Sequence, residues 1–296
     1  MSARDAEDLL TIVICTHNRA DDLRVTLEAI QLMKWAEVIV VDNSSSDATQ
    51  DLLFGFPWTT VIRNNENIGV PGFSIGVAAA STPYVLLLDD DAIPDPSVPD
   101  LIVARFEREP EAAAIACHVV SASGVVVTRD WPDCPVLFWG CGAGVRVDAA
   151  RRTEPMFYPK LRLHGTELDW CIRLYSAGYH VVYEAGARVT HRFSEVNRSP
   201  RRRRRSVTYG SIRFAWDHFS VGGALRATWR ALFSRRVDSV EALIGWVQGL
   251  GDVLKDLGDI RQRRSVVPRH VEDAYLAAVW EYQPRRAPRH PVGFPV

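Results

Sequence analysis

Three consecutive aspartates stand at the end of an apolar run, in the segment LLLDDDAIPD. Unpaired buried carboxylates are costly without a compensating charge, so Asp89, Asp90 and Asp91 indicate a cation nearby. Hard divalent ions such as Mg²⁺ or Mn²⁺ favour carboxylate oxygens and can bridge them to phosphate. The alternative is a solvated acidic turn, because aspartate also favours turns. The segment by itself leaves both interpretations open.

A second acidic pair and one histidine could complete such a site. Glu167 and Asp169 stand at the start of a predicted helix, Leu168–Ala177, within GTELDW. Acidic residues are stabilised at a helix start by the dipole, so capping is the alternative to a catalytic role. His191 ends a short apolar segment and is either a metal ligand or a structural histidine. Metal and acid–base chemistry therefore requires a fold that brings these residues together.

Short apolar strands alternate with helical patterns over the first hundred residues. The predicted strands are Leu9–Thr16, Val38–Asp42, Thr59–Arg63 and Tyr84–Asp89, and one intervening helix is predicted over Gly72–Ala80. This alternation predicts an α/β fold with a doubly wound, mostly parallel, Rossmann-like sheet. Open α/β sheets bind ligands at the carboxyl ends of their strands. Polar clusters that a nucleotide pocket needs follow three of these strands: Thr16–Arg19, Asp42–Ser44 and Asp89–Asp91.

The rest of the chain divides at about residue 195. Before it, further strands are predicted at Ala114–Val119, Gly124–Thr128 and Trp139–Val147, and the helix near Gly178 is followed by a strand, a turn and a short strand ending at His191. After it, helices are predicted at Ser206–Ser234, Asp238–Leu257 and His270–Tyr282, and the proline-rich end is predicted to be extended. We therefore predict two domains, 1–195 and a basic, mainly helical extension, 196–296.

Charge is unevenly distributed, although the net charge is −1. Residues 192–296 hold 20 Arg and Lys against 10 Asp and Glu, or +10, which leaves −11 for residues 1–191. The extension therefore either meets an anionic partner or neutralises the acidic body. Arg201–Arg205 is predicted to be a mobile linker or an anion contact, and Leu225–Arg236 suits an interfacial membrane contact. No aromatic and basic platform accompanies these arginines, so no nucleic-acid partner is predicted.

Composition and cysteine usage predict an ordinary globular protein, with 47% hydrophobic and 24% charged residues. The five cysteines are odd in number and lack metal-finger or redox spacing, which favours a reducing compartment. No apolar run reaches about 18 residues, and the first ten residues are acidic and polar. The predicted location is cytoplasmic, with a peripheral position at the inner face of the membrane left open by the basic helices.

Six segments between about Leu10 and Arg192 resemble, in order, the family 2 glycosyltransferases, which share the GT-A fold. They are VICTHNR, VVDNSSSD, NENIG, LLLDDD, GCGAG and ELDWCIRLYSAGYHVVYEAGARVTH. The resemblance, which extends to rhamnosyl- and galactofuranosyltransferases, implies an inverting, metal-dependent enzyme. Such an enzyme moves a hexosyl or deoxyhexosyl unit from a nucleotide diphosphate-sugar to a hydroxyl of a glycan, a lipid-linked or a small-molecule acceptor.

The resemblance also implies roles for individual residues around the nucleotide-sugar donor. The base and ribose pocket would be lined by Thr16, Asn18, Arg19 and Asp42, and the segment with Asn67 and Gly69 would close over the nucleotide. Asp89 and Asp91 match the outer positions of the family's DxD element. Asp91 would coordinate Mn²⁺ or Mg²⁺ directly with His191, while Asp89 or Asp90 would lie nearer the ribose or sugar, and Asp89 could join the metal.

The catalytic base is where this chain departs from the family pattern. Glu167 matches the position of the base, but the family usually has Glu-Asp where this chain has Thr166-Glu167. Asp169 is therefore the alternative base. Trp139 and Trp170 flank the predicted site and would either stack on sugar rings or pack in the core. The helices of the extension would cover the acceptor side, with inward-facing Tyr209, Arg213 and Trp216.

Two other functions compete with this interpretation. A nucleotidyltransferase that makes sugar nucleotides uses a related sheet, but it normally needs a phosphate loop with glycines and a lysine after the first strand. CTHNRADDLR lacks both the glycines and the lysine. A non-catalytic homologue that only binds nucleotide-sugars is the second alternative, and the retention of Asp91, Glu167 and His191 together argues against it.

Overall fold

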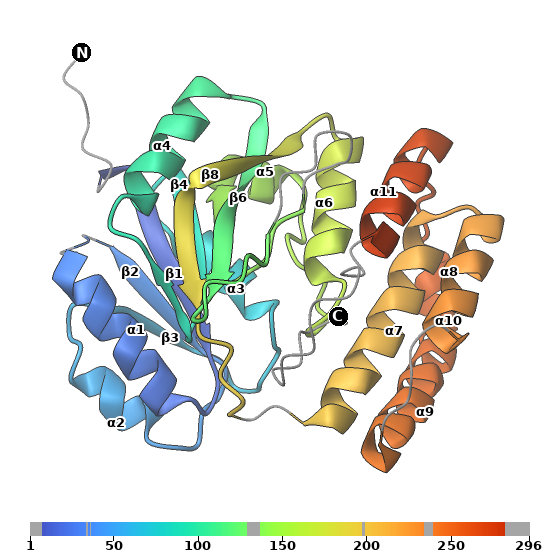
Figure 1. The fold of residues 1–296 in the computed structure, drawn as a ribbon, viewed down its shortest axis with the longest axis horizontal. Coiled ribbons are helices and arrows are strands. Elements are labelled where there is room, and N and C mark those ends of the chain that lie inside the picture. The colour runs from blue at the N-terminus through green and yellow to red at the C-terminus, as the bar shows by residue number, and fades with distance from the viewer. Residues whose placement is uncertain are drawn as a thin grey trace.

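The computed structural model describes residues 8–33, 35, 37–128, 137–196, 199–233 and 239–281. Its centre is one eight-stranded sheet in the order β3-β2-β1-β4-β7-β6-β8-β5 (Figure 1). Pairing is parallel from β3 to β4 and between β6 and β8, and antiparallel where β7 and β5 join. The strands are β1 (Leu10–Thr16), β2 (Val38–Asp42), β3 (Thr60–Arg63), β4 (Tyr84–Asp89), β5 (Ala92–Pro94), β6 (Ala112–Ser121), β7 (Ala143–Arg146) and β8 (His180–His191).

Helices cover both faces of the sheet, as the doubly wound prediction requires. The helices of this part are α1 (Ala20–Met33), α2 (Thr49–Phe54), α3 (Gly72–Ala79), α4 (Val98–Arg108), α5 (Val147–Arg152) and α6 (Thr166–Ser176). Side chains alternate between the faces of a strand, so Ile12 and Ile14 of β1 join one core cluster and Val13 joins the other. Since both faces of β1 are buried, its sequence is continuously apolar rather than alternating.

The middle of the chain differs from the sequence prediction in three places. Gly124–Thr128 is not a strand and contributes one isolated bridge, between Val120 and Val126. The predicted strand Trp139–Val147 is shortened at both ends to β7. This strand begins only at Ala143, and it ends where α5 begins at Val147. The residues from His180 to His191 form one continuous strand, β8, instead of two short ones with a turn between them. Strand β8 gains this length by pairing with β6 along most of its course.

Five helices follow the sheet: α7 (Pro200–His218), α8 (Val221–Phe233), α9 (Val240–Lys255), α10 (Leu257–Arg263) and α11 (Arg269–Glu281). The predicted linker Arg201–Arg205 is instead the start of α7, which Ser199 caps by accepting a hydrogen bond from the backbone N–H of Arg202. The predicted single helix Ser206–Ser234 is broken after His218. Ser220 ends the break by accepting a hydrogen bond from the N–H of Gly223, in the first turn of α8. The predicted extended C-terminus lies outside the described residues.

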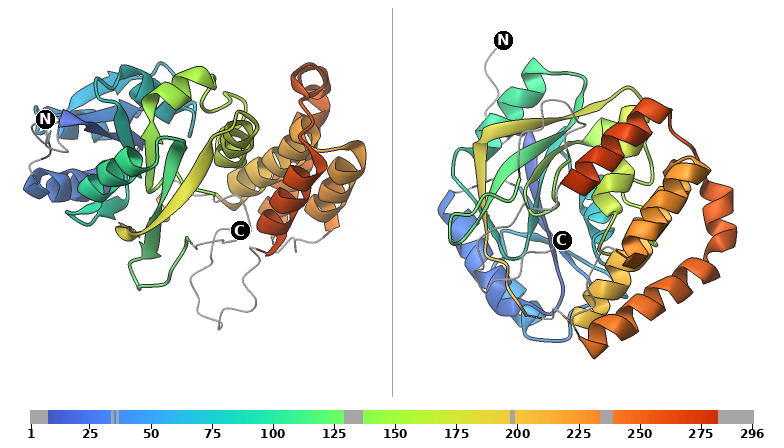
Figure 2. Two further views of the ribbon diagram at one scale, coloured as in Figure 1. Left: turned by 90° about the horizontal axis from the view of Figure 1, so that it is seen from above. Right: turned by 45° about the vertical axis from the view of Figure 1, so that its right-hand side comes forward.

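The C-terminal helices form a group beside α6 in the view of Figure 1 and in the two further views of Figure 2. Phe214, Phe219 and Tyr275 of this group belong to the same buried cluster as Trp170 and Ala113. The parts before and after residue 195 thus share one core. The division into two domains at that residue stays a prediction. Within the described residues, every helix is too short or too polar to span a bilayer.

Helices α7 and α9 run in the same direction and approach each other closely. The approach uses two glycines of α9, since a Cβ at Gly245 would collide with the carbonyl oxygen of Arg201, and one at Gly249 would lie 2.7 Å from that of Arg205. A charge pair also joins the two helices, because the buried Arg213 of α7 pairs at 3.2 Å with Asp256, which follows the last residue of α9. These charges are interior to the helical group, where an unpaired guanidinium would be costly.

Gly245→Ala should therefore destabilise the protein by about 1–3 kcal/mol, because the added methyl group forces apart backbone that has no room to yield. Gly251 lies in the same helix with open space around it, so Gly251→Ala should leave stability unchanged or raise it by up to about 1 kcal/mol. Urea denaturation of the two variants measures the contrast. Equal effects would show that α7 and α9 do not pack as described.

Candidate active site

The three strand-end aspartates have different surroundings, which the sequence could not distinguish. Asp90 is buried, and its carboxylate accepts hydrogen bonds from Thr16 at 2.8 Å and from Arg19 at 2.6 Å. Burial raises the pKa of Asp90 to about 7, against the opposing charge of Arg19. Thr16 and Arg19, which were predicted to line the base and ribose pocket, are thus bonded to the middle aspartate.

Asp91 is fully buried and is joined to the far end of the sheet. Its Oδ1 lies 2.9 Å from Nε2 of His191, and its Oδ2 accepts a hydrogen bond from the backbone N–H of Ser194. Burial alone would raise the pKa of Asp91, but the hydrogen bond with His191 and the nearby charge of Arg19 hold it well below its usual range. The structure thus brings Asp91 and His191 together across 100 positions of sequence, as predicted.

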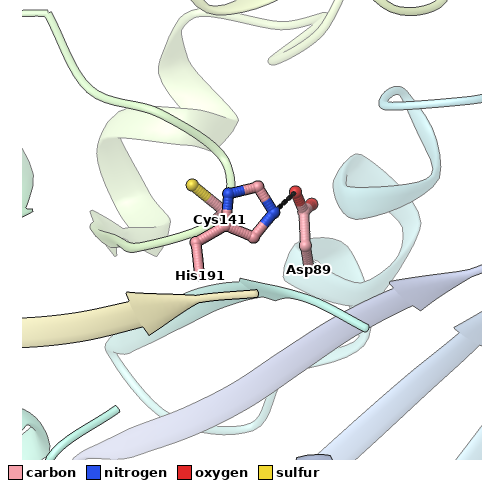
Figure 3. A group of neighbouring side chains, drawn as sticks. All are labelled: Asp89, Cys141 and His191. Atoms are coloured by element: carbon pink, nitrogen blue, oxygen red, sulfur yellow. Dashed lines mark ion pairs between the residues drawn. The ribbon is translucent and has the colours of Figure 1, made fainter. Parts of the chain in front are cut away.

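Asp89 is the strand-end aspartate that is open to solvent, with 39% of its side chain exposed. Its Oδ2 lies 3.7 Å from Nε2 of His191. In the view of Figure 3 the imidazole of His191 is drawn between the sulfur of Cys141 and the carboxylate of Asp89, and one ligand atom of each lies within 4.8 Å of the others. The sequence analysis missed Cys141, although the glycines on both sides of it in GCGAG indicated close approach of that backbone to a ligand.

Glu167 lies in the first turn of α6 and is partly exposed. Its Oε1 accepts a hydrogen bond of 3.4 Å from the N–H of Gly140. Burial raises the pKa of Glu167 to about 7, and the negative charge of Asp89 adds to the shift. A carboxyl group with this pKa can accept a proton at neutral pH and later release it.

Asp169, the alternative base, is held in a buried ion cluster. Its carboxylate bonds to His218 at 2.8 Å and to Arg173 and Arg263 at 2.8–3.0 Å. Although burial opposes ionisation, the hydrogen bond from His218 and the charge of Arg173 keep the pKa of Asp169 far below its usual range. An acid so strongly held in its ionised form is a poor proton acceptor, so the geometry favours Glu167 over Asp169.

The loops after β1 and β2 are bonded to each other. Asn18 adopts a left-handed backbone conformation with φ of 53°, and its Oδ1 accepts hydrogen bonds from the N–H groups of Ser46 and Asp47. Asp42 is buried, and its carboxylate accepts hydrogen bonds from Arg63 and from the N–H of Ser45. The predicted pocket residues therefore meet at one edge of the sheet, where they hold these loops in place.

The segment with Asn67 and Gly69 lies against the residues that precede α6. Asn67 accepts a hydrogen bond from the N–H of Gly69, and Val70 donates one to the carbonyl oxygen of Arg162. Gly69 has φ of +73°, and a Cβ there would collide with the same carbonyl group. Only glycine permits both the positive φ and the close approach to the carbonyl group of Arg162. This contact ties the segment to the residues before α6, the helix that carries Glu167.

The aromatic and basic residues predicted near the acceptor have structural partners. Trp170 is fully buried against Phe138 and Phe157, so it packs in the core. Trp139 is partly buried against the opposite cluster. Tyr209, Arg213 and Trp216, which were predicted to face the acceptor side, bond within the helical group: Tyr209 and Arg213 to Asp256, and Trp216 to Thr228 of α8.

Asp89, Asp91 and His191 are the predicted ligands of a hard divalent cation, whereas the described side chains whose ligand atoms lie within 4.8 Å of one another are Asp89, Cys141 and His191. Six-coordinate Mg²⁺ holds its ligands at about 2.0–2.1 Å, which separates neighbouring ligand atoms by about 3 Å. The distances of 2.9 and 3.7 Å from His191 Nε2 to the two carboxylates are close to that separation. The other ring nitrogen of His191, Nδ1, is buried without a hydrogen-bond partner among the described residues.

The mixed sheet, the flanking helices and the strand-end aspartates with a distant histidine define a protein of the GT-A fold class with C-terminal helices. Residues 11–164 match the profile of the family described as Glycosyl transferase family 2, and the chain belongs to that family. The mannosyltransferase PcManGT from Pyrobaculum calidifontis, in complex with GDP-Man and Mn²⁺, superimposes with a TM-score of 0.57 at 16% identity, covering 93% of this chain and 88% of that one.

Two curated relatives have related sequences. Poly-beta-1,6-N-acetyl-D-glucosamine synthase of Staphylococcus aureus is 26% identical over 117 residues, which are 36% of this chain and 27% of that protein. Glucosyl-dolichyl phosphate glucuronosyltransferase of Haloferax volcanii is 24% identical over 220 residues, which are 63% of this chain and 70% of that protein. The chain thus matches about a quarter of the length of the first relative.

Asp169→Asn should lower the free energy of unfolding by about 3–5 kcal/mol, because it leaves buried cationic partners without their anion. Asp252→Asn is the matched control, since Asp252 pairs with a half-exposed Arg205, and it should cost at most about 1 kcal/mol. Urea denaturation monitored by tryptophan fluorescence gives both values. Similar losses in the two variants would argue that Asp169 is not the centre of a buried cluster.

Proposed function

We propose that the protein is an inverting glycosyltransferase that moves a hexosyl or deoxyhexosyl unit from a nucleotide diphosphate-sugar to an acceptor hydroxyl. The observation that carries the proposal is the position of Glu167: its partly exposed carboxylate accepts a hydrogen bond from the N–H of Gly140, and the next residue, Cys141, lies within 4.8 Å of ligand atoms of Asp89 and His191. A proton acceptor thus lies beside candidate metal ligands. Rhamnose or galactofuranose as the donor sugar is part of the proposal and rests on the sequence resemblance.

The donor side of the reaction depends on Asp89, Asp91 and His191, which would hold Mn²⁺ or Mg²⁺. When bound, such an ion supplies positive charge that stabilises the diphosphate leaving group. Arg19 contributes a fixed charge at the same place, 3.5 Å from Asp91, and keeps the adjacent carboxylates from repelling each other. The loops after β1 and β2 would bind the nucleotide, at the edge where open α/β sheets bind ligands.

On the acceptor side, Glu167 would take the proton of the attacking hydroxyl. Attack from the side opposite the leaving group then inverts the anomeric configuration in one displacement. Help from a positioned general base is worth about 10²–10⁴-fold in rate. The closing segment at Asn67–Gly69 is bonded next to α6, so its position and that of Glu167 are linked.

Incubation with a panel of UDP-, GDP- and dTDP-linked sugars and Mn²⁺ tests the proposal. Release of a nucleoside diphosphate that stops with excess chelator supports it. Pyrophosphate formation from a nucleoside triphosphate and a sugar phosphate would instead identify a nucleotidyltransferase. Binding of nucleotides without any turnover, with or without an acceptor, would favour the non-catalytic homologue.

Glu167→Gln should lower turnover by about 10²–10⁴-fold while nucleotide binding and the melting temperature stay close to those of the unchanged protein. The amide keeps the size of the side chain but cannot accept the proton. In the unchanged protein, turnover should rise with pH through about 7, because only the ionised carboxylate is a base. Full activity of Glu167→Gln, or a flat profile across that range, would remove Glu167 from this role.

We propose also that α8 contacts an anionic membrane surface. Val221, Leu225 and Trp229 recur every four residues and are 56–65% exposed, so they form one apolar stripe along the helix. Arg226 and Arg230 form the adjacent exposed stripe. Apolar and basic stripes side by side are typical of helices that lie in a membrane interface, where each arginine near anionic lipid contributes about 1 kcal/mol.

Flotation with phosphatidylglycerol-containing vesicles should carry the full chain upward, and pure phosphatidylcholine vesicles should carry much less. Leu225→Glu should abolish flotation, because it places a like charge in the apolar stripe that meets the anionic surface. Leu32→Glu is the control, since Leu32 of α1 is 86% exposed far along the chain from α8. If Leu225→Glu floats as well as Leu32→Glu, then α8 does not bind lipid.

A further inference from the structure

The thiol of Cys141 lies at the proposed cation site but has no role in the proposed transfer. Its sulfur, a carboxylate oxygen of Asp89 and an imidazole nitrogen of His191 lie within 4.8 Å of one another (Figure 3). Cys141 and His191 are only 6% and 5% exposed. The three side chains come from the end of β4, the turn before β7 and the end of β8. The fold therefore supplies a soft ligand beside two harder ones.

Hard and soft cations should use this group differently. Mg²⁺ and Mn²⁺ prefer oxygen ligands, so they would use the carboxylates at this edge and leave the Cys141 sulfur out. Zn²⁺ binds thiolate, imidazole and carboxylate together, and it displaces the thiol proton to solvent as the metal–sulfur bond forms.

We propose that Asp89, Cys141 and His191 form a Zn²⁺ site that excludes the catalytic cation. Nδ1 of His191 is buried without a hydrogen-bond partner among the described residues, and Figure 3 shows it on the side of the ring nearer Cys141, whereas Nε2 faces Asp89. Asp89 and His191 belong to both ligand sets, so the two kinds of ion compete. Four-coordinate Zn²⁺ with three protein ligands keeps a single open position, whereas Mn²⁺ or Mg²⁺ keeps several for phosphate oxygens. Zn²⁺ binding does not depend on the proposed function, but the inhibition that follows from it does.

Cobalt titration of the full chain, without nucleotide or acceptor, tests the site directly. Co²⁺ replaces Zn²⁺ and shows a thiolate-to-metal charge-transfer absorption in the near ultraviolet when sulfur is a ligand. The absorption should appear in the unchanged protein, disappear on addition of Zn²⁺, and be absent from Cys141→Ala. Cys117→Ala is the matched control, because Cys117 is another buried free cysteine outside the group, and it should keep the absorption. Cys134→Ala, at a position outside the described residues, serves as a second control.

The unchanged protein alone can overturn the proposal, since absence of the absorption means that no cysteine binds the metal. Retention of the absorption in Cys141→Ala would assign it to another thiol and equally reject the site. Zn²⁺ affinity, measured by competition with a chromophoric chelator, should fall at least about 10–100-fold in Cys141→Ala. Mutation of a residue that only hydrogen-bonds to a metal ligand already lowers metal affinity by that factor. Cys141→Ser, closer in size, repeats the measurement should the alanine variant misfold.

An activity measurement separates this proposal from the proposed transfer. Zn²⁺ should inhibit Mn²⁺-supported transfer, and Cys141→Ala should require correspondingly more Zn²⁺ for the same inhibition. Equal inhibition of both proteins would overturn the exclusion of the catalytic cation through Cys141. If no donor is turned over, the proposed function fails, while the cobalt spectra still decide whether the Zn²⁺ site exists.

Discussion

The structure depends on neutralising two buried carboxylates at the end of β4. Asp90 and Asp91 are adjacent in sequence and almost without solvent, so each needs a partner. Arg19 reaches them from the loop after β1, and His191 reaches Asp91 from the end of β8. These contacts join the parallel half of the sheet to the mixed half at one edge. They leave Asp89 as the exposed carboxylate, at the place where a ligand can approach.

A second buried charge cluster joins the helix that carries Glu167 to the C-terminal helices. Asp169 of α6 bonds to His218 at the end of α7 and to Arg263 at the end of α10. The helix that presents Glu167 is therefore held from behind by chain that lies 49–94 positions later. Two carboxyl groups separated by one residue thus have opposite surroundings, and their pKa values move in opposite directions from the usual range.

The same edge of the sheet offers ligands of two chemical kinds. Carboxylates of Asp89 and Asp91 suit hard ions, while the Cys141 thiol suits soft ones. The hard ligands follow from a pattern that the family shares, whereas the thiol reaches them only because the turn before β7 lies beside the ends of β4 and β8. Which metal this edge would select therefore depends on the fold as much as on the aspartates at the end of β4.

The sequence by itself determined the strands of the parallel half, the acidic strand end and the helix that carries Glu167. Continuous apolar runs followed by polar residues located β1, β2, β3 and β4 to within about one residue, because strand burial is a local pattern. Only the tertiary structure decided which carboxylates are exposed, where α7 ends and α8 begins, and that Cys141 lies beside Asp89 and His191. Those features depend on partners far along the chain, as with Asp91 and His191, and local periodicity contains no information about such partners.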